Sequence, residues 1–186
     1  GALFINTSRG AVADNAALNK LLSTRSDLSV VLDVWEGEPA INTELLQRID
    51  IGTPHIAGYS LDGKLRGTEM IYQSACEYFG QPGQWRVSDN LPAGAVVDVA
   101  APAGISAAAL LQQAVSRCYD ICADDARLRA MLALPGDEQA ACFDRLRKDY
   151  PVRREFSATT LRLPAGNDTA GQVLGGLGFV VAAQSV

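Results

Sequence analysis

The stretch Phe4–Val12, Phe-Ile-Asn-Thr-Ser-Arg-Gly-Ala-Val, decides how the first part of the chain folds. Its apolar beginning gives way to small polar residues, one arginine and one glycine before a helical pattern starts. This change predicts the carboxyl end of a strand that is covered on both faces. Ligands of open α/β sheets bind outside the carboxyl ends of the strands, so Arg9 stands where a small anion could be held. A solvated arginine in an ordinary strand-to-helix turn would give the same pattern.

An alternation of strands and helices extends outward from this stretch. The apolar run Ala2–Ile5 leads into it, and Asp14 has the character of an N-cap before a helix with one apolar stripe. Leu28–Val34 is a β-branched, apolar strand, and a short helix at Thr43–Arg48 separates it from the extended segment Ile51–His55. A strand-helix-strand order implies a right-handed crossover, so the sequence predicts an α/β fold with neighbouring parallel strands.

Polar side chains follow each of the three predicted strands. Arg9 follows the first, Asp33 with Glu38 close behind it the second, and His55, the only histidine of the chain, the third. Because the carboxyl ends of parallel strands meet at one edge of a sheet, we expect these groups to converge on a single cleft. An arginine can bind a carboxylate, a carboxylate can hold an imidazole, and an imidazole can carry a proton in both directions near neutral pH. The combination predicts an acid-base site for a small anion.

Each of these residues also has an ordinary structural explanation. Arg9 can be a solvated turn residue, and Asp33 can cap a neighbouring helix. Glu38 can be a loop charge, and His55 a hydrogen-bonded surface group. Pattern alone leaves both interpretations open.

The remainder of the chain predicts a long helix, a linker and a second, smaller unit. The long helix spans Ser60–Phe79 and stops at Gly80, and the proline- and glycine-containing residues 81–104 form an extended linker or an edge. The predicted helices and strands of the second unit indicate a small α+β domain, and no glycine-rich phosphate loop occurs in the sequence. Its predicted elements are helices at Ser106–Cys122, Asp124–Leu134 and Asp137–Arg147, a strand-like stretch at Arg153–Leu163, a helix capped at Asn167, and a strand at Phe179–Val181.

Composition limits the possible partners. The chain has 186 residues, 48% hydrophobic residues and a net charge of −5 with both signs interspersed, which argues against nucleic acid or an anionic membrane as a partner. No apolar run approaches the roughly 20 residues that cross a bilayer, and the start shows no leader pattern, so we expect a cytoplasmic protein. The chain enters a buried-strand pattern directly at Gly1, and we therefore expect a fragment of a longer protein.

The chain has four cysteines, at positions 76, 118, 122 and 142, which are too few and too scattered for a disulfide framework in a domain of this size. Cys118 and Cys122 stand four residues apart in a helical pattern and could share a face. A metal site there would need further ligands, and the only histidine is far away in the sequence. Buried thiols are the better interpretation, so no metal is predicted.

Three segments closely resemble the signature segments of the NAD-dependent D-2-hydroxyacid dehydrogenases. They are Asn6–Asp14, Leu32–Pro39 and Thr53–Gly58, in the family's order and spacing. The resemblance implies that residues 1–57 form the C-terminal part of a Rossmann-like NAD-binding domain. It also implies that residues 58–92 are a return helix and linker toward a substrate-binding domain.

The later part of the chain is similar to the C-terminal dimerisation domain of one branch of this family. The similar residues lie within Cys118–Arg129 and Phe143–Glu155. The similarity implies a dimerisation domain at residues 93–186, a homodimer, and a small phosphorylated 2-hydroxy acid as substrate.

The resemblance also implies roles for single residues at the site. Arg9 would bind the carboxylate and C2 oxygen of the substrate, and Tyr59 would touch the substrate. His55 would be the general acid-base, with Glu38 as its partner. A hydroxyl that gives up a hydride needs an acceptor for its proton, and a histidine beside a carboxylate provides one.

The cofactor implied by the resemblance is NAD. Asp33 would contact its nicotinamide end, Gly58 would line the cofactor site, and Thr7 would add a backbone or hydroxyl contact nearby. The glycine-rich loop and its acidic ribose-binding residue are absent, so we expect only part of the cofactor site here and no turnover by this stretch alone.

Two alternatives remain open. One is another member of the family, such as a phosphoglycerate or hydroxypyruvate enzyme. The other is a non-catalytic module that senses NAD and dimerises, because related folds include transcriptional corepressors. Arg9, Glu38 and His55 would be present in each case.

Overall fold

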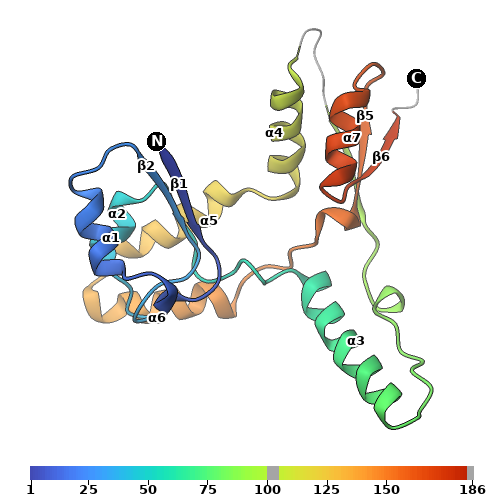
Figure 1. Ribbon diagram of the computed structural model, residues 1–186, viewed down its shortest axis with the longest axis horizontal. Coiled ribbons are helices and arrows are strands. Elements are labelled where there is room, and N and C mark those ends of the chain that lie inside the picture. Colours follow the sequence, from blue (N-terminus) through green and yellow to red (C-terminus); the bar gives the residue numbers. More distant parts are fainter. Residues whose placement is uncertain (100–104, 184–186) are drawn as a thin grey trace. The chain divides into compact units, whose positions relative to one another are not determined.

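The computed structural model describes residues 1–99 and 105–183 and divides into two compact units (Figure 1). The first unit consists of Gly1–Gly58 and Ile121–Pro151, and the second of Tyr59–Asp120 and Val152–Val186. Among the described residues, no helix has the length and apolar character needed to cross a membrane.

The first unit contains a three-stranded parallel sheet, as the strand-helix-strand order predicts. Its strands are β1 (Ala2–Asn6), β2 (Leu28–Leu32) and β3 (Ile51–Gly52), in the order β1-β2-β3. Asn6 pairs with Leu32, and Leu32 with Gly52, so the three carboxyl ends are level at one edge. The residues that follow the strands therefore begin at the same edge of the sheet.

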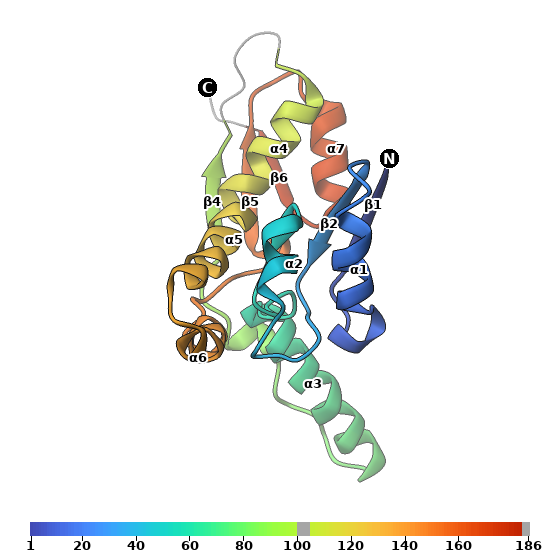
Figure 2. The ribbon, with the colours of Figure 1, turned by 90° about the vertical axis from the view of Figure 1, so that its left-hand side faces the viewer.

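Two helices cover one face of this sheet, side by side (Figure 2). α1 (Asn15–Leu22) begins at Asp14, whose carboxylate accepts a hydrogen bond from the Ala17 amide at 2.8 Å, as its N-cap character predicts. α2 (Thr43–Arg48) is capped in the same way by Asn42. The core between the helices and the sheet is formed by fully buried residues of β2 and α2, namely Val30, Leu32, Leu45 and Leu46.

Two helices from far along the chain complete the first unit. They are α5 (Ile121–Ala130) and α6 (Gly136–Lys148), and Leu128 of α5, Phe143 of α6 and Met131 of the 3-10 helix between them are buried in the same core cluster as β2. Polar contacts fix α5 further, because Asp125 accepts from the backbone N–H of Gly52 at 2.7 Å and Arg129 donates to the carbonyl oxygens of Leu46 and Ile49.

These helices make the compact units differ from the predicted limits 1–57, 58–92 and 93–186, because residues 121–151 pack with the first unit. The reason is a set of long-range contacts that leave no local signal in the sequence. The roles predicted for residues 58–92 and 93–186 stay predictions.

The second unit holds another three-stranded parallel sheet. Its strands are β4 (Ala95–Asp98), β5 (Thr159–Leu163) and β6 (Val180–Ala183), in the order β4-β5-β6. β4 lies in the segment predicted as an extended linker or an edge, and it is an edge strand. The stretch predicted as strand-like from Arg153 becomes a strand only at Thr159.

Within its described residues, the second unit has three α-helices. α4 (Ala107–Cys118) and α7 (Asp168–Gly176) pack on each other and on β5, with Leu110, Leu161 and Leu174 fully buried between them. The long helix α3 (Leu61–Tyr78) matches the predicted span and is capped by the Ser60 hydroxyl. The expected small domain of helices and strands is present, with its strands parallel.

The cysteines differ from the sequence-based interpretation. The helix predicted at Ser106–Cys122 ends at Cys118, because Tyr119 adopts an extended conformation, and α5 begins anew at Ile121. Cys118 is half-buried, and burial raises the pKa of its thiol above the ordinary value while a hydrogen bond with Thr159 opposes the shift. Cys122 is exposed, so the interpretation of a buried thiol is wrong for this residue.

Candidate active site

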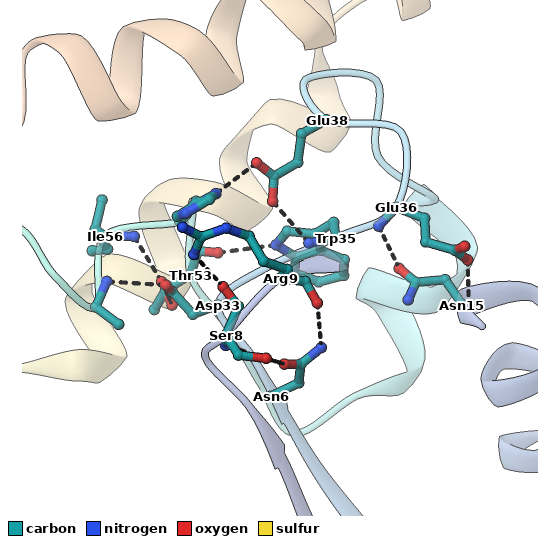
Figure 3. A network of polar contacts seen from close by, with 12 residues as sticks. Asn6, Ser8, Arg9, Asn15, Asp33, Trp35, Glu36, Glu38, Thr53 and Ile56 are labelled. Carbon is teal, nitrogen blue, oxygen red and sulfur yellow. Dashed lines mark hydrogen bonds and ion pairs between the residues drawn. The ribbon is translucent and has the colours of Figure 1, made fainter. Parts of the chain in front are cut away.

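The turn that carries Arg9 is built by a buried asparagine at the end of β1. The Asn6 side-chain amide donates to the Arg9 carbonyl oxygen at 3.1 Å, and its Oδ1 accepts from the N–H and the hydroxyl of Ser8 (Figure 3). The exposed Arg9 guanidinium donates to the Ser8 carbonyl at 2.6 Å. The backbone is thus fixed while the charged end of Arg9 stays accessible to an anion.

Gly10 fits this turn tightly against the loop after β2. A Cβ on Gly10 would lie 2.0 Å from the carbonyl oxygen of Trp35, so only glycine permits the approach. A second contact joins the same segments, because the Asn15 N–H donates to Glu36 and the Glu36 N–H donates back to the Asn15 side chain. Together these contacts hold the turn of Arg9 against the loop that leads to Glu38.

Glu38 and His55 form a hydrogen-bonded pair at this edge. His55 Nδ1 lies 2.7 Å from Glu38 Oε2, and Glu38 Oε1 accepts from the backbone N–H of Trp35 at 2.8 Å. The two side chains are 28% and 18% exposed, so the pair is neither sealed nor fully solvated. With Nδ1 directed to the carboxylate, Nε2 is the ring nitrogen that can exchange a proton with a ligand.

His55 adopts a left-handed backbone conformation, with φ of 55°, which is uncommon for a residue with a side chain. Its N–H donates to the Asp33 carbonyl oxygen at 2.7 Å. The buried Asp33 carboxylate accepts from the Thr53 hydroxyl at 2.6 Å, the Ile56 N–H at 2.7 Å and the Ala57 N–H at 3.0 Å. These donors offset the cost of burying the charge and fix the loop on both sides of His55.

The structure brings four of the residues selected from the sequence to one edge of the first sheet. They are Arg9, Asp33, Glu38 and His55. Figure 3 shows Arg9, Asp33 and Glu38 around Trp35, with Thr53 beside Asp33. Tyr59 is the first residue of the second unit, and the Lys64 ammonium lies over its ring, 3.8 Å from the ring centroid.

Sequence reasoning did not select Trp35 or Thr53. Trp35 is 2% exposed, and its indole N–H donates to the Thr53 carbonyl oxygen at 3.0 Å. The available signal was chemical, since a buried tryptophan usually needs an acceptor for its N–H. The sequence does not show which acceptor that is.

The residues predicted to contact NAD differ in the space around them and in their remaining hydrogen-bonding capacity. Asp33 is 3% exposed, and its carboxylate accepts three hydrogen bonds from its own chain. A Cβ on Gly58 would meet nothing within 4 Å, and Thr7 is exposed at the end of β1. These positions fit a cofactor at the strand ends. Within residues 1–99 and 105–183 no group of three or more metal-ligating side chains occurs.

Comparison with known proteins identifies the class. Residues 1–57 match the NAD binding domain of the D-isomer specific 2-hydroxyacid dehydrogenase family, and residues 90–178 match a domain of unknown function, DUF3410. Residues 1–57 therefore belong to the NAD binding domain of the D-isomer specific 2-hydroxyacid dehydrogenase family, and they contain the strand ends and the Glu38–His55 pair described above.

The curated relatives reported below all have the same enzyme name. The chain is similar to the erythronate-4-phosphate dehydrogenase of Ectopseudomonas mendocina, with 49% identity over 88% of this chain and 43% of the relative. The enzyme of the same name from Cellvibrio japonicus is 49% identical over 96% of this chain and 48% of its own length. That of Marinobacter nauticus is 45% identical over 95% of this chain and 46% of its own length. The chain therefore spans slightly less than half the length of these relatives.

Proposed function

We propose that this chain is the C-terminal half of an oxidoreductase that oxidises the C2 hydroxyl of 4-phospho-D-erythronate to the 2-oxo acid, with hydride transfer to NAD. The observation that carries the proposal is the 2.7 Å contact of His55 with Glu38 at the sheet edge where the turn of Arg9 also lies. The printed name of the relatives supports the substrate. The reaction would belong to the synthesis of pyridoxine and pyridoxal 5′-phosphate.

The residues have distinct roles in this reaction. The Arg9 guanidinium binds the substrate carboxylate and polarises the C2 oxygen. As the C2–H and O–H bonds break, His55 Nε2 accepts the hydroxyl proton and a carbonyl forms at C2. Glu38 stabilises the imidazolium that results and keeps Nδ1 directed toward itself. NAD, when bound, supplies the acceptor of the hydride.

The cofactor and substrate contacts complete the proposal. Asp33 contacts the nicotinamide end of NAD, the open space at Gly58 accommodates the cofactor, and Thr7 adds a contact nearby. Tyr59 touches the substrate. It directly follows Gly58 in the chain, four residues after His55.

The second half of the chain is assigned to assembly. We propose that residues 58–92 lead to the substrate-binding domain and that a cytoplasmic homodimer forms through residues 93–186. Val96 of β4 and Val180 of β6 are each more than half exposed, and both are in register with Thr160 of the central strand β5, which supports a partner for that face of the sheet.

A substrate panel with the full-length enzyme tests the proposal. Purified enzyme with NAD is offered 4-phosphoerythronate, 3-phosphoglycerate and glycerate, and reduced nicotinamide is followed by its absorbance. We expect 4-phosphoerythronate to give the highest kcat/KM. A preference for 3-phosphoglycerate or glycerate would replace the substrate but keep the class, whereas NAD binding without turnover of any hydroxy acid would favour the sensing module.

A further inference from the structure

We propose that Trp35 and Thr53 are positioning residues that hold the His55 imidazole on Glu38. This inference rests on the proposed function, because it concerns the same proton-transfer pair. Neither residue directs a polar side-chain atom to the substrate in the proposed mechanism. Both act through the backbone and the carboxylate that shape the loop of His55.

Trp35 contacts the segments that carry each of the three proposed catalytic residues. Its backbone N–H donates to Glu38 at 2.8 Å, and its carbonyl oxygen lies against Gly10, the neighbour of Arg9. Its indole N–H donates at 3.0 Å to the carbonyl of Thr53, two residues before His55. One buried residue therefore sets the spacing of three strand-end segments that lie far apart in sequence.

Thr53 transmits this placement to the loop. It is buried, its carbonyl oxygen is held by the indole, and its hydroxyl donates at 2.6 Å to Asp33. Asp33 in turn holds the amides of Ile56 and Ala57, which follow His55 directly. The loop is therefore fixed before His55 by Thr53 and after it by Asp33.

The conformation of His55 explains why such fixing is needed. A non-glycine residue at φ of 55° persists only where the surrounding contacts hold it. If the anchor at Thr53 is lost, the backbone can relax toward an ordinary conformation. The imidazole then moves off Glu38, although both side chains are still present.

The side chain of Trp35 can be tested by Trp35→Phe in the full-length enzyme. Phenylalanine keeps an aromatic ring in the core but removes the indole N–H. We expect kcat to fall by about 10- to 100-fold, as for a small misplacement of a reacting group, with the KM for the hydroxy acid and the affinity for NAD within about twofold of wild type. The matched control is Trp85→Phe in the second unit, which should leave kcat unchanged. A kcat for Trp35→Phe equal to that of the control would overturn the proposal.

Thr53 provides a second pair of variants that does not depend on the folding of Trp35→Phe. Thr53→Val is nearly isosteric but has no hydroxyl for Asp33, whereas Thr53→Ser keeps the hydroxyl. We expect Thr53→Val to lose kcat and Thr53→Ser to retain most of it, with the KM little changed in both. Equal kcat values for the two variants would contradict positioning through the Asp33 hydrogen bond.

A crystal structure of Trp35→Phe separates this inference from the proposed function. If the wild-type enzyme oxidises no 2-hydroxy acid, the proposed function fails, but the Nδ1 to Oε2 distance in the variant still decides the positioning role. A distance well beyond the 2.7 Å of the wild type supports the proposal. An unchanged distance with unchanged φ at His55 refutes it.

Discussion

In each unit a carboxylate is paired with a basic side chain, and the two pairs differ in burial and in the number of hydrogen bonds that they make within the chain. In the second unit, Asp62 is 2% exposed and accepts two hydrogen bonds from Arg154 and a third from the Glu155 N–H. Arg154 also donates to the Pro92 carbonyl oxygen, and Ser60 donates to the Glu155 carboxylate. This pair joins the start of α3, the segment before β4 and the segment before β5 within one unit.

The Glu38–His55 pair of the first unit is less buried and makes fewer hydrogen bonds within the chain. Its side chains are 18% and 28% exposed, and the imidazole uses only one of its two nitrogens in the contact. A pair that holds structure uses its donors internally, whereas a pair that exchanges protons must keep an atom accessible to a ligand. The comparison supports a structural role for Asp62–Arg154 and agrees with the proton transfer that we propose for Glu38–His55.

The largest expected effect tests the chemical pair. His55→Ala in the full-length enzyme removes the proton acceptor, so kcat should fall by a factor on the order of 10² to 10⁴. NAD affinity, measured by titration, and the melting temperature should stay close to wild type. Glu38→Gln should give a smaller loss, because it keeps the imidazole and removes only the charge beside it. Near-normal turnover by His55→Ala would end the acid-base assignment.

The next effect tests the structural pair. Asp62→Asn leaves the Arg154 charge without its partner, and breaking a buried pair costs about 3 kcal/mol in the free energy of unfolding. Denaturant unfolding of the full-length enzyme measures the change. The control is Arg25→Ala, which breaks the solvent-exposed pair with Asp27 and should leave stability unchanged. If both variants were equally stable, the Asp62–Arg154 pair would have no structural role.

The pH dependence of stability gives a finer test of the same pair. Burial raises the pKa of Asp62, but the hydrogen bonds from Arg154 and the Glu155 N–H and the Arg154 charge outweigh it, so the pKa lies below its ordinary value. A lowered pKa in the folded state contributes stability above the unfolded-state pKa of about 4, and this stability is lost as the pH falls through the folded-state value.

The wild type should therefore lose stability progressively below about pH 4, more steeply than Asp62→Asn, which has no carboxylate at this position. Thermal melts between about pH 2 and 7 measure both slopes. Identical slopes would show that Asp62 does not contribute to acid unfolding.

The smallest expected effect concerns the open side of the chemical site. Gly58→Ala places a methyl group where no atom lies within 4 Å, so the melting temperature should not change. If Gly58 lines the cofactor site, the dissociation constant for NAD should rise about tenfold at most, with kcat at saturating NAD retained. The control is Gly136→Ala, another glycine with open space around it, which should alter neither property. Unchanged NAD affinity in Gly58→Ala would remove Gly58 from the cofactor site.

Local sequence signals predicted much of the first unit. Asp14 marks the start of α1, and the β-branched run after Leu28 marks β2, because caps and periodicity act over a few residues. The parallel order then placed Arg9 and His55 at one sheet edge. The break between α4 and α5 falls at residues 119–120, earlier than the predicted end at Cys122, because Tyr119 interrupts the helix and no glycine or proline marks the position.

The sequence by itself therefore determined the parallel arrangement of the first three strands, the edge where the polar residues gather, and the family resemblance of the segments around Arg9, Glu38 and His55. Only the tertiary structure decided that α5 and α6 complete the first unit, that Trp35 and Thr53 hold the loop of His55, and that Asp62 meets a partner 92 residues away. The physical reason is the separation in sequence between the residues that interact. Caps and periodic patterns express interactions between near neighbours, whereas a buried donor shows only that it needs an acceptor, and folding decides which one it finds.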